Sequence, residues 1–127
     1  MIKITESTHY EVFKEYEQVF LNIKQINEKV LIGDFYGEVQ KAIITPEEKY
    51  CVMIGCGVII YLLKMPFKPY EYDILNEQWR EWHRNGDIWV EDAVVENNKN
   101  LILQLEGGEK AQIDLKVLDK KLRSNLV

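Results

Sequence analysis

The sequence predicts an α+β protein, a curved antiparallel sheet of five or six strands with a long N-terminal helix and a second short helix packed on it. Three observations support this prediction. Apolar residues within positions 9–28 recur every three or four residues, the spacing of an amphipathic helix. The run 50–63, YCVMIGCGVIIYLL, contains no charged residue and indicates a buried strand. The runs 100–106 and 109–117 alternate apolar and polar residues on either side of Gly107-Gly108, a strong hairpin signal.

The first predicted elements are a short strand around Ile2 and Ile4 and the helix at 9–28. Thr8 and Glu11 fit a capping box at the start of that helix, because the hydroxyl and the carboxylate can satisfy free backbone N–H groups. The apolar stripe of the helix would consist of Val12, Phe13, Tyr16, Val19, Phe20, Ile23 and Ile26.

The middle of the chain is expected to contain a strand near 39–44 and a turn at 45–49, after which residues 50–63 pair back as a hairpin. Two prolines within 65–70 exclude regular structure there. Asp73 can then cap a short helix at 74–84 that ends near Asn85-Gly86. One face of this helix would hold Leu75, Gln78, Trp79 and Trp82.

Four interpretations compete for residues 50–63. A membrane span needs about 20 apolar residues, so this run is too short. A phosphate-binding loop needs a helix after its glycines, whereas Gly57 is followed by more strand-forming residues. A metal site is disfavoured because Cys51 and Cys56, an odd number apart, would point to opposite faces of a strand. The favoured interpretation is one long bent strand, covered on both faces, with small buried thiols.

Three further strands are predicted, at 87–96, 100–106 and 109–117. Residues 118–127 are expected to form a tail or a short terminal helix. A chain of 127 residues without a long linker or a repeat suits a single domain, 1–127.

Charge and composition restrict the class of protein. The net charge is −5, and because residues 116–127 carry a net +3, the remaining 115 residues carry −8. A nucleic-acid binder is usually basic, so this class is disfavoured, and basic protein partners should be attracted. The N-terminus resembles no signal peptide and the cysteines are few, so we expect a cytoplasmic protein with neither a membrane partner nor a cofactor.

Catalytic machinery is not evident in the sequence. His83 could pair with Glu81 or Asp87 as an acid and a base, but no nucleophile accompanies it, because Ser7 falls at a predicted helix cap and Ser124 in the tail. No hydrolase, metalloprotease or kinase motif is present. We therefore expect a protein that is not an enzyme and binds no metal.

Carboxylates and aromatic residues lie close together between positions 70 and 92, a combination that suits an interface with a basic protein. Glu91 and Asp92 are adjacent on a predicted strand and would point to opposite faces unless a bulge intervenes. Trp89 would face away from Val90 and Val94 and act as a partner anchor. The predicted binding residues are Tyr70, Glu71, Tyr72, Asp73, Trp89, Glu91 and Asp92.

Several segments together resemble the small cytoplasmic immunity proteins that accompany bacterial polymorphic or contact-dependent toxins. These segments are KAIITPEEKYCVMIGCGVIIYLL, PFKPY, NEQWREW and DIWVEDAV, and they cover roughly residues 35–95. The resemblance implies an antitoxin function: tight binding of a cognate toxin domain, often a nuclease, without catalysis. It assigns no individual residue a role.

Two alternatives remain open at this point. The chain could be a non-enzymatic accessory or regulatory protein that self-associates, for example as a homodimer, and a toxin gene next to its own would argue against this. It could also be a small-molecule binder or an enzyme, which a deep pocket lined by His83 and carboxylates would support.

Overall fold

The structure, a computed structural model, is an all-β fold and not the predicted α+β fold. It describes residues 1–84 and 88–116. Over these residues eleven strands form three antiparallel sheets, and only residues 115–116 are helical. The predicted helix end at 85–86 and the tail at 118–127 lie outside the described residues, as do the first residue of the strand predicted at 87–96 and the last residue of the strand predicted at 109–117.

The N-terminal sheet replaces the predicted long helix. Its strands follow one another in the order β1-β2-β3-β4. They are β1 (Ile2–Glu6), β2 (Tyr10–Glu15), β3 (Gln18–Ile23) and β4 (Glu28–Asp34). Val12 pairs with Leu21 and Leu21 with Val30, so one face of the sheet is apolar across three strands.

The helix prediction at 9–28 was wrong because the 3–4 spacing results from two strands joined by turns. Tyr16 has a φ of 55° and Asn27 a φ of 48°, left-handed conformations that end β2 and the β3–β4 turn. Tyr16 and Ile26, two members of the predicted apolar stripe, are exposed at these turns. Within β3 the buried apolar residues Val19, Leu21 and Ile23 follow the period of two expected of a strand.

The central sheet has the order β5-β6-β7-β8. Its strands are β5 (Lys41–Ile44), β6 (Tyr50–Gly55), β7 (Gly57–Leu62) and β8 (Trp79–Trp82). The predicted pairing of the 39–44 strand with the uncharged run is confirmed, since Ile44 lies opposite Cys51.

The uncharged run is itself a hairpin rather than one long strand. Ile54 pairs with Val58 around a tight turn at Gly55, Cys56 and Gly57. Gly57 has a φ of 94°, and a Cβ there would lie 2.6 Å from the carbonyl oxygen of His83. A glycine is therefore required at this turn both by its conformation and by the close approach of another segment.

The second predicted helix, at 74–84, is also absent. Residues 79–82 form β8, which pairs with β7 through Ile60 and Arg80. Trp79 and Trp82 would share one face of a helix, but an odd separation in a strand sends them to opposite faces. Trp79 is accordingly buried against the N-terminal sheet, and Trp82 packs toward the C-terminal sheet.

The C-terminal sheet confirms the predicted hairpin around Gly107-Gly108. Its order is β11-β10-β9. The strands are β9 (Val90–Glu96), β10 (Asn100–Leu105) and β11 (Lys110–Asp114). Gln104 pairs with Asp92 but Leu105 pairs with Val90, so Glu91 is the extra residue of a β-bulge.

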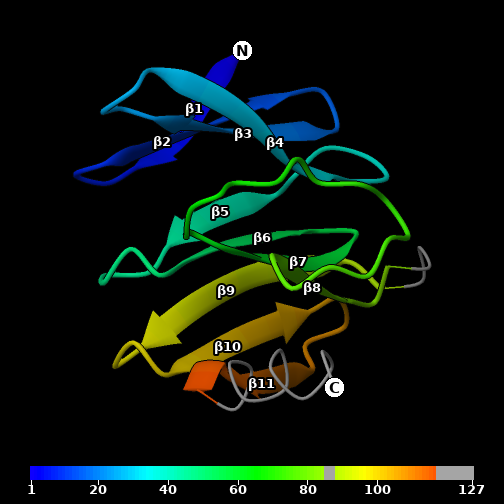
Figure 1. Cartoon of the computed structure of the whole chain (residues 1–127). Helices are drawn as coiled ribbons and strands as arrows, with labels where there is room; N and C mark the ends of the chain where they lie inside the picture. Colours follow the sequence, from blue (N-terminus) through cyan, green and yellow to red (C-terminus); the bar gives the residue numbers. More distant parts are fainter. Residues whose placement is uncertain (85–87, 117–127) are drawn as a thin grey trace.

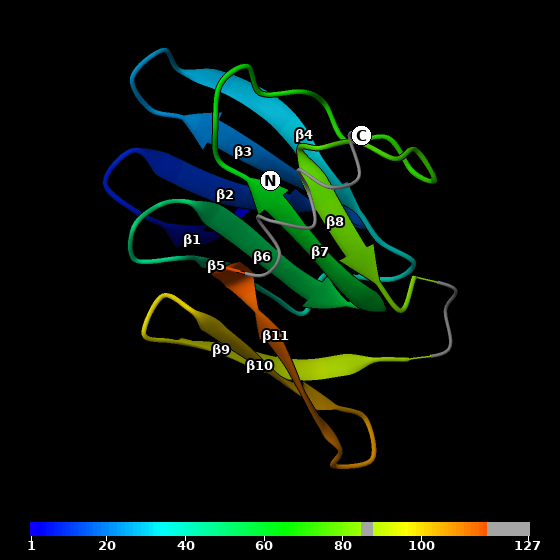
Figure 2. The same cartoon turned by 60° about the horizontal axis from the view of Figure 1, so that its bottom comes forward.

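The three sheets stack as layers, with the central sheet between the other two (Figure 1 and Figure 2). Alternate residues of β6 and β7 enter the two interfaces. Cys51, Met53, Ile59 and Tyr61 pack against the N-terminal sheet, while Tyr50, Val52, Ile54, Val58 and Ile60 pack against the C-terminal sheet. Burial on both faces explains why residues 50–63 contain no charge, and the predicted burial of this run is confirmed.

Residues 65–70 form no regular element, as the prolines predicted. Their backbone instead covers the outer edge of the N-terminal sheet, where the Tyr70 N–H donates to the carbonyl of Leu31 over 2.8 Å. The hydroxyl of Tyr61 donates to the carbonyl of Lys68 and fixes the segment from the other side. The covered edge of β4 is thereby protected from pairing with other chains.

Candidate functional site

Loops from all three layers meet at one end of the stack, the end at which the β6–β7 hairpin turns (Figure 1). The turn at 16–17 contacts the segment 35–40, because the Phe35 N–H donates to the carbonyl of Glu17 over 2.8 Å. The Gly37 N–H donates to the carboxylate of the same glutamate. The side-chain Nε2 of Gln40 donates to the carbonyl of Glu91 over 3.4 Å. This hydrogen bond links β9 of the C-terminal sheet to the segment 35–40.

Arg84 holds these loops together. Its Nη1 donates to the carbonyl of Cys56 over 2.9 Å, and its Nη2 donates to the carbonyl of Asp34. Its Nε lies 2.9 Å from Oε1 of Glu81, and its Cζ lies 4.6 Å from the centre of the Phe35 ring. One largely buried guanidinium thus links the end of β4, the β6–β7 turn and β8.

Tyr70, one of the predicted partner-binding residues, belongs to this internal network and not to the surface. Its side chain is buried, and its hydroxyl donates to Glu81. Burial and the neighbouring carboxylate raise the pKa of the Tyr70 hydroxyl, so it remains a neutral donor. Tyr70 therefore supports the loop that follows it from inside the fold.

The outer surface of this end carries large apolar side chains that no other part of the described protein covers. They come from the turn after β2, the loop after β4 and the loop between β7 and β8. We call this group the rim. Its members and exposed fractions are Tyr16 at 82%, Tyr36 at 83%, Tyr72 at 63%, Ile74 at 47% and Leu75 at 98%.

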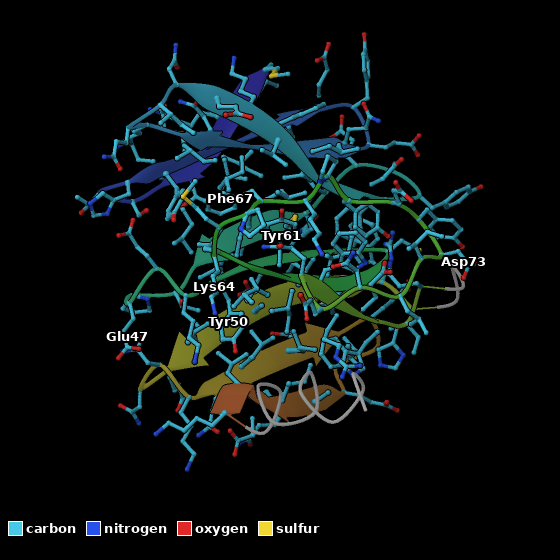
Figure 3. The ribbon with its side chains drawn as sticks, in the orientation of Figure 1. Glu47, Tyr50, Tyr61, Lys64, Phe67 and Asp73 are labelled. Atoms are coloured by element: carbon cyan, nitrogen blue, oxygen red, sulfur yellow. The ribbon has the colours of Figure 1, made fainter. Side chains whose placement is uncertain are left out.

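Exposed carboxylates neighbour the rim residues in the sequence. Asp73 lies at this end of the molecule, whereas Glu47 lies at the opposite end (Figure 3). The exposed carboxylates beside the rim are Glu15, Glu17, Glu38, Glu71, Asp73 and Glu91. The nearby cations are already paired, with Lys14 near Glu38, Lys41 near Asp92 and Arg84 near Glu81.

Two rim loops contain left-handed residues that are not glycine. Tyr16 has a φ of 55° and Asp73 a φ of 61°, and His83, which directly follows β8, has a φ of 54°. Asp and His tolerate this region comparatively well, but a tyrosine there is uncommon and costs stability. The ring of Tyr16 is nevertheless mostly in solvent, so packing within the described protein does not account for it.

The other predicted residues divide between the rim and the C-terminal sheet. Glu71, Tyr72 and Asp73 are exposed on the loop between β7 and β8, which we call the rim loop. Glu91 and Asp92 both face solvent, because the bulge at Glu91 interrupts the alternation of β9. Asp92 forms an ion pair of 2.9 Å with Lys41, and this contact lowers the pKa of the Asp92 carboxyl.

Trp89 is not the exposed anchor that the sequence suggested. Its backbone forms a bridge to Cys56, and its carbonyl accepts from the Glu106 N–H over 2.9 Å. The residue is half-buried. The expected grouping of Val90 with Val94 was also wrong, since Val90 and Ala93 are buried while Val94 is exposed on the other side of the bulge.

Tyr16 and Tyr36 were missed by the sequence interpretation. The first was assigned to the apolar stripe of a helix and the second to an unassigned loop. Both tyrosines lie in short segments that favour a turn, and this could have marked them as exposed. Tyr16 lies within the polar segment Glu15–Gln18, and Tyr36 directly precedes Gly37.

A second polar cluster lies at the opposite end of the stack, where Ser7 and His9 meet Glu48. The Ser7 hydroxyl donates to Oε2 of Glu48, and Nδ1 of His9 lies 2.6 Å from Oε1. Ser7 therefore lies in the β1–β2 turn and not at a helix cap. Because serine and histidine both bind the carboxylate rather than each other, the arrangement lacks the nucleophile–base contact of a catalytic triad.

The cysteines are separate buried thiols. Cys51 is fully enclosed, and burial raises the pKa of its thiol to about 12, so it stays protonated. Within residues 1–84 and 88–116, no group of three or more His, Cys, Asp or Glu side chains is arranged to hold a metal ion. The same residues include no helix with the length and apolar character needed to cross a membrane.

In comparisons with known proteins, no family model, no curated protein and no solved structure matches this chain.

Proposed function

We propose that this protein binds a basic protein partner through the rim, and that the partner is a toxin domain which it neutralises in the cytoplasm. The observation that carries the proposal is the exposure of five large apolar side chains on loops from two sheets at one end. Such a group, bordered by polar residues, is typical of a protein–protein interaction surface.

The composition of the rim favours a protein partner. Tyrosine supplies a large contact area, and fixing it costs little conformational entropy, which is why it is enriched in binding loops. The rim presents three tyrosines on loops that Arg84 and the Glu17 contacts hold in place. A preformed surface of this kind loses less entropy on binding than a flexible loop would.

The charge of the rim favours a basic partner. Among the residues that the structure describes, Lys14 and Lys41 near its carboxylates already pair with Glu38 and Asp92, and the chain outside residues 116–127 carries −8. Complementary charge accelerates encounter, while buried aromatic contacts slow dissociation. A nuclease toxin, which must itself bind a polyanion, is a partner whose basic surface suits this rim.

The experiment is to co-express the chain with the products of neighbouring genes and to measure both binding and survival of cells that express the toxin. Glu91→Lys reverses an exposed charge at the rim end, and Glu47→Lys makes the same change at the opposite end. We expect Glu91→Lys to slow association at least about fivefold at low salt and Glu47→Lys to slow it less.

Raising the salt concentration should reduce the association rate of the unmodified protein and change dissociation less, because the Debye length shortens to about 10 Å at 0.1 M. Failure of every neighbouring gene product to bind, with no protection of cells, would contradict the proposal. Concentration-dependent dimerisation that Ile74→Ser abolishes would instead assign the rim to self-association.

A further inference from the structure

A hollow of about 320 Å³ opens beside the rim loop. It lies between that loop and the end of β8. Its lining residues are Tyr72, Asp73, Glu81, Trp82, His83 and Arg84. The volume is at the lower end of the range for ligand sites, which suits one side chain better than a whole cofactor.

The charges in the hollow leave a net negative site. Arg84 is neutralised by Glu81 at 2.9 Å, and its other donors are directed to the carbonyls of Cys56 and Asp34. Asp73, in contrast, forms no ion pair with any of residues 1–84 and 88–116. A bound anion would meet Asp73 without a free guanidinium to hold it, so the hollow favours a cation.

Two aromatic side chains complete the lining, Tyr72 from the rim loop and Trp82 from β8. Aromatic faces attract cations, and a tryptophan face attracts them most strongly. A carboxylate beside two aromatic residues is a combination that binds the flat guanidinium group, which can stack and form two hydrogen bonds at once.

We propose that this hollow receives an arginine side chain of the basic partner, with Asp73 as its carboxylate and with Tyr72 and Trp82 as its aromatic contacts. The inference rests on the proposed function and identifies the group that the rim recognises. Arginine is favoured over lysine because lysine is a compact, strongly hydrated charge that gains less from flat aromatic neighbours.

The test uses small probes in place of the partner. The full chain, labelled with ¹⁵N, is titrated with N-acetylarginine methylamide, with the lysine analogue and with the uncharged citrulline analogue. We expect the indole signal of Trp82 to shift with the arginine probe, with a dissociation constant on the order of millimolar. The lysine and citrulline probes should bind at least about fivefold more weakly. Trp79, whose Nε1 donates to the carbonyl of Ile74 inside the fold, serves as the internal reference.

The matched variants are Asp73→Asn and Glu47→Gln, which remove one exposed carboxylate at opposite ends. Asparagine tolerates the left-handed backbone at position 73, so the loop should keep its conformation, and unchanged backbone signals elsewhere would verify this. Asp73→Asn should weaken binding of the arginine probe at least about fivefold, whereas Glu47→Gln should leave its dissociation constant unchanged.

Equal shifts with arginine and citrulline, equal binding of arginine and lysine, or no effect of Asp73→Asn would each overturn this assignment. These outcomes are distinct from failure of the proposed function. If a partner binds the rim and its affinity is the same for Asp73→Asn and for Glu47→Gln, the proposed function stands and the arginine site is refuted. If the arginine probe binds selectively but no protein partner is found, the arginine site stands and the proposed function is refuted.

Discussion

Tyr16 shows at the residue scale how the rim departs from what stability alone would select. Its backbone φ of 55° suits glycine or asparagine, yet the position holds a tyrosine whose ring is exposed. Left-handed residues that are not glycine cost of order 1–3 kcal/mol and are found preferentially at functional sites. Folding alone does not explain this side chain, and its exposure fits the partner contact that we propose for the rim.

The first prediction follows from this strain. Tyr16→Asn should raise the free energy of unfolding by about 1 kcal/mol, measured by urea denaturation, because asparagine adopts the left-handed region more readily. The same variant should bind the proposed partner at least about fivefold more weakly, since an exposed tyrosine is lost from the proposed interface. A variant that is less stable, or one that binds with unchanged affinity, would contradict the role given to Tyr16.

Glu48 gives a second prediction, which concerns pH. Hydrogen bonds from Ser7 and then from His9 lower the pKa of the Glu48 carboxyl from 4.5 to about 2. A carboxyl whose pKa is lower in the folded state stabilises the fold above its unfolded pKa, and this stabilisation is lost as the pH falls. The window for this loss is therefore from about pH 4.5 down to about pH 2.

The measurement compares the unmodified protein with Glu48→Gln between pH 7 and pH 2. We expect the variant to be less stable at pH 7 and the difference between the two proteins to shrink through that window. A difference that stays constant with pH would show that the Ser7 and His9 contacts do not depend on the charge of Glu48.

At the element scale, the β6–β7 turn is the feature on which the rim depends. Gly57 and Gly107 both have a positive φ, 94° and 93°, but their surroundings differ. A Cβ at Gly57 would approach the carbonyl oxygens of His83 and Trp82 to 2.6 and 2.8 Å, whereas a Cβ at Gly107 would have no neighbour within 4 Å. Comparing a substitution at Gly57 with the same substitution at Gly107 therefore separates the free-energy cost of a left-handed backbone from the cost of steric crowding.

The third prediction uses this pair. Gly107→Ala should destabilise by about 1 kcal/mol, the conformational cost alone. Gly57→Ala should destabilise by about 2–4 kcal/mol, because overpacking against backbone is added to the same conformational cost. Thermal or urea unfolding of both variants checks this. Equal losses of unfolding free energy would show that residues 82–84 do not crowd a side chain at position 57.

Elements with strong local signals were predictable from the sequence. The hairpin at 100–117 was predicted because Gly107-Gly108 separates two alternating runs, and the pairing of β5 with β6 because a proline-containing turn precedes the uncharged run. The helix at 9–28 was predicted wrongly because two short strands with a turn at Tyr16 reproduce the 3–4 spacing. That turn contains no glycine, proline or asparagine, so no local residue marked it.

The site was predictable only in part, and for related reasons. Glu71, Tyr72 and Asp73 are neighbours in sequence, so composition alone places them together. Tyr16 and Tyr36 are brought together by the hydrogen bonds from Phe35 and Gly37 to Glu17, tertiary contacts that no local pattern encodes. Tyr70 differs from Tyr72 because its backbone N–H binds β4 and turns its ring inward, and the bulge at Glu91 is likewise a product of pairing with β10.

At the scale of the whole molecule, the central sheet is shared by two separate cores. Ile59 and Ile60 are adjacent in β7, both fully or almost fully buried, and face opposite layers. The fourth prediction is that Ile59→Ala and Ile60→Ala each destabilise by about 2–5 kcal/mol, as buried large-to-small changes do. Urea denaturation checks this. A loss near 0.5 kcal/mol for either variant, the size of a surface substitution, would contradict burial on both faces.

The layered arrangement also explains why the rim exists. Because the strands of all three sheets are antiparallel, their connecting loops gather at two opposite ends of the stack (Figure 1). One end holds the Ser7, His9 and Glu48 cluster, and the other holds Arg84, the exposed tyrosines and Asp73, which forms no ion pair with another residue that the structure describes. Association of a basic partner should therefore be confined to one end of the molecule.

The most direct test compares two isoleucines with nearly equal exposure at the two ends, Ile74 at 47% on the rim and Ile26 at 50% in the β3–β4 turn. The dissociation constant of the proposed partner, a toxin domain, is measured for Ile74→Ser and Ile26→Ser under identical salt conditions. Ile74→Ser should weaken binding about tenfold or more, and Ile26→Ser less than twofold. Equal effects of the two substitutions, or a larger effect of Ile26→Ser, would contradict a partner site at the rim.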